Sequence, residues 1–198
     1  MQTAHTKLIS KVFTDVLSID DAKGHLRIPL ANTDQDGLIS SCMTAAITAA
    51  EARTERLFST SVYQIRIEPE DMTLVLPFPD YLELTKVEAV STTGVTSTLF
   101  LKGTPDTGTL ADFLEVDSWV VPAEITFITD NVPELTRYLI LTITFGTTLI
   151  PEHVIQAIKM LIGHYFDNPK AVVTGTIATQ LPLGAETLLA MEHFKRFG

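Results

Sequence analysis

The sequence predicts an α+β protein in which a small helical core is interrupted by a β-rich insertion. Two observations carry this prediction. After Pro151, the apolar residues Val154, Ile158 and Leu161 recur at helical spacing. Between residues 62 and 145 the apolar residues instead alternate at every second position, as in half-buried strands. The insertion is therefore expected to lie between the second and third helices of one domain, and a mobile helix is expected to follow at the C-terminus.

Residues 1–58 are expected to hold an N-terminal segment and the first two helices of the core. Ser18-Ile19-Asp20-Asp21 is a capping-box pattern that begins a short helix over residues 19–27, which stops before Pro29. A second helix begins at Asp34 or Asp36 and continues for roughly 22 residues, because no proline interrupts its apolar spacing. Its alanine-rich middle favours close packing against another helix.

The insertion is predicted to span residues 59–146 and to consist of short strands. The segments predicted to be strands are 62–68, 72–76, 81–90, 96–101, 119–121, 125–129 and 138–145. Residues 85–109 are rich in Thr and Gly and hold few large apolar side chains, which is typical of exposed hairpins and loops.

The core helix is predicted within residues 147–166. Pro151 suits the first helical position, where its missing N–H is not needed, and Glu152 lies where the positive end of the helix dipole favours an acid. Val154, Ile158, Leu161 and Tyr165 then form an apolar stripe. The helix is therefore expected to be buried.

The remaining residues are predicted to form a flexible connector, 167–183, and a C-terminal docking helix, 184–198. The connector is rich in small residues and contains Pro169 and Gly175. The helix has an apolar side, made by Leu188, Leu189, Met191, Phe194 and Phe197, which a single helix at a chain end cannot bury alone. We expect these residues to bind a partner surface; the alternative is that the helix folds back on its own core.

The net charge of −10 is concentrated in the middle of the chain. Residues 59–150 carry −9, whereas residues 1–30, 31–58 and 151–198 carry +1, −2 and 0. An acidic surface repels phosphates, so strong DNA binding is not expected. The acidity suits either a channel wall that does not hold passing DNA or a β-rich surface that is kept soluble.

Other features of the sequence point away from secretion and from catalysis. The single cysteine, Cys42, excludes an internal disulfide and is expected to be a small buried hydrophobe, as in a protein made in a reducing cytosol. No apolar run has the length of a membrane span, and no signal peptide is apparent, so we expect a soluble, unsecreted protein.

Motifs for metal or cofactor binding are absent from the sequence. Residues 32–37 resemble the first half of a calcium-binding loop. The twelfth position of such a loop, normally a Glu that binds calcium, is Met43 here. His153 and His164 on the core helix would lie about 16 Å apart, too far to share one metal. No nucleotide-binding glycine loop or nucleophile elbow occurs. We therefore expect a protein that is not an enzyme, with no catalytic residues, no metal and no cofactor.

Several motifs, in order, resemble those of the tailed-phage head-tail connector (adaptor) proteins, the rings bound beneath the portal of a DNA-filled capsid. They are Ala22-Lys23-Gly24-His25-Leu26-Arg27 in the first helix, the second helix from Asp36 to Arg56, Leu76-Pro77-Phe78-Pro79, the Ile150-Pro151 turn with its helix, and Leu181-Pro182-Leu183-Gly184. The family's aromatic-acid-x-Arg ending after the core helix is not matched, because the chain here reads Phe166-Asp167-Asn168-Pro169.

The resemblance implies a structural protein of the virion neck, made in the bacterial host cytoplasm. It implies a homo-oligomeric ring, a dodecamer matching the portal, which provides a DNA channel for ejection and a docking surface. The implied partners are the portal protein, for which the C-terminal apolar side is the candidate site, and a stopper or tail-terminator protein. DNA would pass through without sequence-specific binding, and no membrane is involved. The alternatives are a stopper or tail-completion protein of the same neck region, or an enzyme of unknown class.

Overall fold

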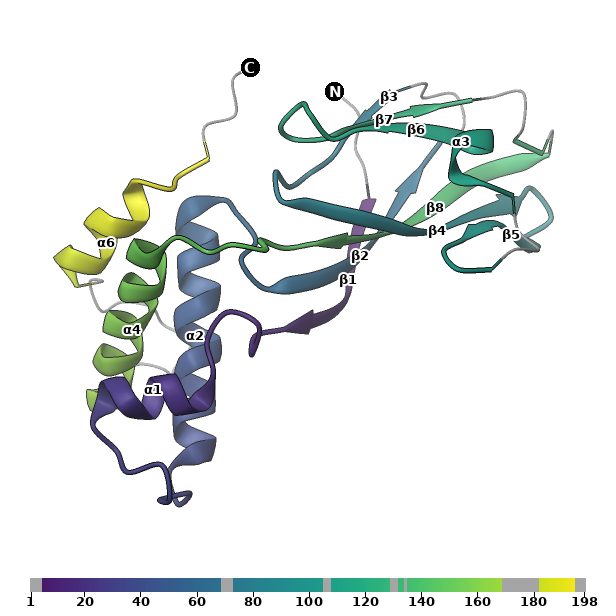
Figure 1. Ribbon diagram of the computed structural model, residues 1–198. Helices are drawn as coiled ribbons and strands as arrows, with labels where there is room; N and C mark the ends of the chain where they lie inside the picture. The colour runs from purple at the N-terminus through teal and green to yellow at the C-terminus, as the bar shows by residue number, and fades with distance from the viewer. Residues whose placement is uncertain are drawn as a thin grey trace. The chain divides into compact units, whose positions relative to one another are not determined.

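The computed structural model describes residues 5–68, 73–104, 108–128, 132–133, 135–168 and 182–194 (Figure 1). It confirms the predicted α+β class, with helices and antiparallel sheets in one chain. The chain divides into two compact units. The β unit comprises residues 1–11 and 60–146, and the helical unit comprises residues 12–59 and 147–198.

The helical unit is built from α1 (Ile19–Leu26), α2 (Asp36–Thr54), α4 (Glu152–Asp167) and α6 (Leu183–Ala190). Helix α4 packs against both α2 and α6 (Figure 1). The stripe predicted on α4, Val154, Ile158, Leu161 and Tyr165, is buried, so the face assignment is confirmed. Together with Ile39, Ile47 and Phe58 and other apolar residues of α1, α2 and α6, it forms a single core.

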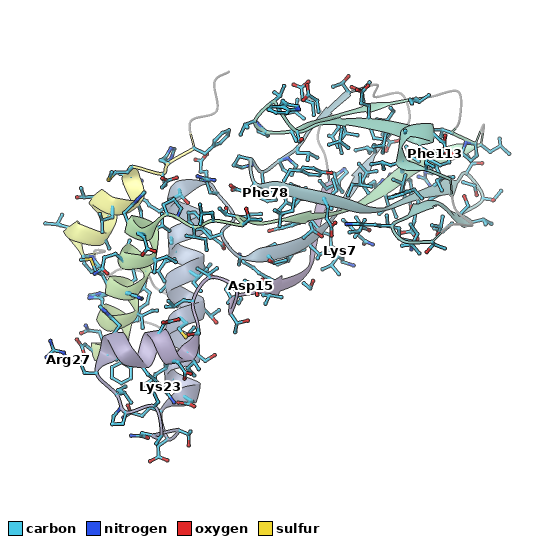
Figure 2. The ribbon with its side chains drawn as sticks, viewed as in Figure 1. Lys7, Asp15, Lys23, Arg27, Phe78 and Phe113 are labelled. Atoms are coloured by element: carbon cyan, nitrogen blue, oxygen red, sulfur yellow. The ribbon has the colours of Figure 1, made fainter. Side chains whose placement is uncertain are left out.

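A buried lysine joins the first two helices. The predicted cap of α1 is formed, since the Ser18 hydroxyl accepts a hydrogen bond from the Asp21 N–H at 3.1 Å. Lys23, labelled in Figure 2, is almost fully buried, and its Nζ lies 2.6 Å from the Asp36 carboxylate at the first residue of α2. The same Nζ donates to the Leu30 carbonyl at 3.3 Å. These contacts satisfy the buried charge and fix the connection between α1 and α2.

The β unit contains two antiparallel sheets. The larger sheet has the strand order β1-β2-β8-β4-β5, and the smaller has the order β3-β7-β6. The strands of the larger sheet are β1 (His5–Val12), β2 (Thr60–Ile67), β4 (Tyr81–Ser91), β5 (Thr96–Leu101) and β8 (Thr136–Phe145). Those of the smaller sheet are β3 (Thr73–Val75), β6 (Leu114–Asp117), which follows the short helix α3 (Leu110–Phe113), and β7 (Glu124–Phe127).

The proline-flanked segment after β3 is attached to the larger sheet by aromatic side chains. Phe78 contacts Tyr63 of β2 and Phe145 of β8, with ring centroids 4.9 and 5.3 Å apart. Tyr63 and Phe145 also meet edge to face at 5.8 Å. Such ring pairs stabilise a fold beyond the area they bury.

The structure differs from the sequence-based expectations at three places. Residues 119–121 form no strand but an exposed loop between β6 and β7; the strand lies at residues 114–117, where apolar and acidic residues do alternate. Strand β1 was not predicted, because it buries almost nothing and shows no apolar alternation. The last helix ends at Ala190, earlier than expected, and residues 195–198 lie outside the described part of the chain.

Candidate functional site

The predicted docking helix lies against the core of its own unit. Helix α6 packs on α4 and also contacts α2 (Figure 1). Its second residue, Gly184, approaches α4 closely, since a Cβ atom at this position would lie 2.8 Å from the Met160 methyl group. The Leu-Pro-x-Gly pattern thus places a glycine at a close contact between helices.

The five predicted partner-binding residues fall into different environments. Leu189 is fully buried, and Leu188 is partly buried against the helical core. Phe194 is partly buried, whereas Met191 is 69% exposed. Phe197 lies outside the described residues. For Leu188 and Leu189 the structure therefore has the second expected arrangement, in which the helix folds back on its own core; partner binding through this side stays a prediction.

Ion pairs connect the C-terminal segment to the end of α2. Arg56 Nη1 lies 2.7 Å from a Glu192 carboxylate oxygen, and the other oxygen of Glu192 lies 3.1 Å from Nε2 of His153. Arg53 Nη2 lies 2.8 Å from Glu186. The Arg56–Glu192 pair is the more shielded of the two arginine pairs, so water screens it less.

The backbone adds a further contact at the same place. The Phe194 N–H donates a hydrogen bond to the Thr54 carbonyl, the last residue of α2, at 2.8 Å. This carbonyl is one of those that a helix end leaves without an intrahelical partner. The C-terminal segment therefore completes the end of α2, and its own position is fixed in return.

Two exposed leucines of this unit were not proposed from the sequence. Leu183, the first residue of α6, is 82% exposed, and Leu149, in the turn before α4, is exposed to a similar extent. Leu183 directly follows Pro182, and Leu149 lies two residues before Pro151, so neither belongs to the periodic part of a helix. Leu183 and Met191 are the exposed large apolar residues among described residues 182–194.

The residues considered for metal binding and thiol reactivity have structural surroundings in the described part of the chain. Within the described ranges, no group of three His, Cys, Asp or Glu side chains could hold a metal ion. Asp36, in the segment that imitates a calcium loop, is the first residue of α2 and pairs with Lys23. Cys42 is fully buried, and burial raises the pKa of its thiol, which disfavours the reactive thiolate. In the same described part, no helix is both long and apolar enough to span a bilayer.

Comparisons with known proteins identify the fold. The sequence matches no protein-family model and no curated protein. The structure does match chains from particles of a gene transfer agent (GTA). A chain from the neck of an empty GTA particle, computed with C6 symmetry, has a TM-score of 0.68 at 18% identity, with 98% of this chain and 97% of that chain covered.

Two further structures agree with this match. A chain from the virion of a native GTA particle has a TM-score of 0.69 at 17% identity, with 97% and 96% of the two chains covered. A chain from the neck of a native GTA particle, computed with C12 symmetry, has a TM-score of 0.66 at 17% identity, with 98% and 97% covered. The protein therefore shares its fold, along nearly its whole length, with chains of a phage-like particle.

Proposed function

We propose that the protein is a structural head-tail connector of a tailed phage or phage-like particle. The observation that carries this proposal is the extent of the structural likeness: it covers 97 to 98% of this chain with TM-scores of 0.66 to 0.69, and two of the matched chains come from a particle neck. The likeness thus extends over both units, instead of one common supersecondary motif. The role does not require enzymatic activity or a cofactor.

The proposed assembly is a ring in the virion neck, between the portal protein and the tail. A ring of twelve copies agrees with the C12 symmetry of one matched neck and is compatible with the C6 symmetry of the other. The partners are the portal protein, identical copies of this chain, and a stopper or tail-terminator protein. We place synthesis in the host cytoplasm and the mature protein in the virion.

DNA would pass through this ring without being held. Residues 59–150 carry −9, so fields from this part of the chain oppose the approach of phosphates. Duplex binding at about 0.15 M salt is expected to be weak, because affinity for duplex DNA comes largely from phosphates neutralised by Lys and Arg. Sub-micromolar binding at that salt concentration would contradict the role as a passive channel.

The C-terminal segment is the proposed contact with the portal or a neighbouring subunit. Met191 and Leu183 are accessible in the folded subunit, whereas Leu188 and Leu189 would be available only if α6 left α4. Met191→Asp and Leu183→Asp should therefore reduce incorporation into heads without changing the fold. Val95→Asp, at an exposed position of the β unit, is the matched control.

Electron cryomicroscopy of particles that carry the protein tests the main proposal, with particles lacking it as the control. The expected result is a ring of density directly beneath the portal that the two units fit. Density one layer further from the portal would instead identify a stopper or tail-completion protein of the same neck. Particles whose neck is complete without the protein would overturn the proposal.

A further inference from the structure

The loop between β6 and β7 exposes large apolar side chains. Trp119 is 96% exposed, and Val121 is 59% exposed. The base of the loop is nevertheless well anchored, because Pro122 and Ala123 are buried and the Ala123 carbonyl accepts a hydrogen bond from the Leu76 N–H at 2.9 Å. An anchored loop that holds a tryptophan in water is suited to binding another surface, since aromatic residues are enriched in interface cores.

The strands beside this loop carry acids on one face. Glu115 and Asp117 occupy alternate positions of β6, and Asp117 lies directly opposite Glu124 of β7. Because alternate residues share a face, all three carboxylates lie on the side opposite the buried Leu114 and Ile125. None of the three forms an ion pair with a described residue, and like charges directly opposite each other destabilise a strand pair. A cation from outside the subunit would relieve this repulsion.

Strand β1 has the complementary character. It is an edge strand of the larger sheet, and nearly every one of its residues is exposed. Lys7, Ile9 and Lys11 alternate along it and so share a face, while residues 5–12 contain no acid. Ile9 is 48% exposed, and Lys7 is labelled in Figure 2. One face of β1 is therefore basic at two positions and apolar between them.

We propose that the Trp119 loop and the acidic face of β6 and β7 of one copy pack onto the Lys7, Ile9 and Lys11 face of β1 in a neighbouring copy of this chain. The apolar tip would cover Ile9, and the carboxylates would lie near the lysines. The occupant is inferred from charge complementarity: described residues 108–128 contain four acids and no Lys or Arg, whereas residues 5–12 contain two lysines and no acid. Complementary charges fix the partner and the register of a contact.

The two surfaces differ and lie on the same chain, so their contact is of the head-to-tail kind. Repeated contacts of this kind close into a ring when the rotation between neighbours allows it. The inference therefore rests on the proposed function and makes it more specific, since it names the surfaces that join neighbouring copies. It also assigns a role to β1, which adds little to the core.

Cysteine crosslinking tests the contact directly. The only native cysteine, Cys42, is buried, so an introduced cysteine is the only accessible thiol. A copy carrying Ile9→Cys is mixed with a size-tagged copy carrying Trp119→Cys and with wild-type protein. The mixture is allowed to form rings and is then oxidised. We expect the mixed disulfide as the main product. Val95→Cys, exposed at the β4–β5 turn, replaces Trp119→Cys in the control and should give little product.

Charge reversal provides a second readout. Lys7→Glu and Glu115→Lys should each weaken ring assembly roughly tenfold, and the double variant should recover most of the loss, because close interfacial charge pairs couple strongly. Both positions are exposed, so circular dichroism should show an unchanged fold. A double variant that assembles worse than either single variant would overturn the proposed pairing.

The outcomes separate this inference from the proposed function. The crosslinking is done on rings in solution or, if the free protein is monomeric, on the necks of purified particles. A ring that forms without the mixed disulfide, or with equal crosslinking to the control cysteine, overturns the contact and leaves the connector role intact. A Trp119 loop that crosslinks only to another neck protein has the same consequence. Particles without any ring of this protein would overturn both.

Discussion

Helix α4 and the β6–β7 loop are both rich in apolar residues, but these side chains are buried in α4 and exposed in the loop. In α4 the apolar side chains recur every three or four residues, and Val154, Ile158 and Leu161 are all fully buried. In the loop they are contiguous, and Trp119 to Val121 are all exposed. The difference shows that burial follows the period of the apolar residues more closely than their number.

The comparison also separates residues that hold the fold from residues that are free to act on a partner. An apolar residue in α4 contributes to stability by leaving water and filling the core. An apolar residue at the loop tip neither leaves water nor fills the core in the isolated chain. Substitutions in the two regions should therefore differ in their effect on the free energy of unfolding. Each of the following predictions measures part of that difference.

The largest effect is expected in α4. Ile158→Ala or Leu161→Ala should lower the free energy of unfolding by roughly 2 to 5 kcal/mol, because each removes buried methyl groups and leaves a cavity. Denaturant unfolding measures this. His164→Ala, on a partly exposed position of the same helix, is the control and should cost much less. A larger loss for His164→Ala would mean that the face of α4 is misassigned.

A smaller loss is expected at Glu51, a buried carboxylate in the last turn of α2. Glu51 accepts hydrogen bonds from the Phe58 N–H at 3.0 Å, the Ser59 N–H at 2.9 Å and the Ser59 hydroxyl at 2.6 Å. Glu51→Ala removes the acceptor of these three hydrogen bonds and should lower the free energy of unfolding by roughly 1 to 3 kcal/mol.

Thermal and denaturant unfolding of Glu51→Ala, beside Glu55→Ala, checks this expectation. Glu55 is largely exposed and is a matched acidic control one turn further along the chain. Equal losses for the two variants would show that the hydrogen bonds of Glu51 add nothing to stability.

Local patterns were sufficient to predict the helices and strands whose buried residues recur with the period of that element. The capping box at Ser18, the proline at the start of α4 and the alternation in β8 each located an element to within a few residues. Strand β1 lacked such a pattern, because almost all its residues are exposed and it is defined only by pairing with β2. Residues 119–121 had strand-forming side chains but no buried face.

The candidate site was predictable only in part. The apolar side of the C-terminal helix follows from helical spacing, but its contact with α4 joins distant parts of the chain, and no local rule selects it over a partner. The same holds for the Arg56–Glu192 pair, whose members are 136 residues apart. Leu183 and Leu149 were missed because one is the first residue of α6 and the other lies in the turn before α4, where a single exposed leucine has no periodic neighbour.

A still smaller effect is expected at the pairs that hold the C-terminal segment. Arg56→Ala should lower the global free energy of unfolding by at most about 1 kcal/mol, as partly exposed ion pairs contribute little. It should nevertheless speed hydrogen exchange in α6, because local opening requires less free energy than global unfolding. Arg53→Ala, at the more exposed pair, should change exchange less. Faster exchange in α2 or α4, with α6 unchanged, would contradict this role.

The smallest effect is expected at the loop tip, and it completes the comparison within a single hairpin. Trp119→Ala should change the free energy of unfolding by no more than about 0.5 kcal/mol, because a side chain that is already in water loses no burial. Ile125→Ala, in the adjoining strand β7, should lower it by roughly 2 to 5 kcal/mol, since Ile125 is fully buried. Thermal unfolding of the monomeric subunit measures both. A destabilisation above about 1 kcal/mol for Trp119→Ala would show that the tryptophan supports its own fold. The exposed loop would then lose its separate role, and the contrast with α4 would be one of degree.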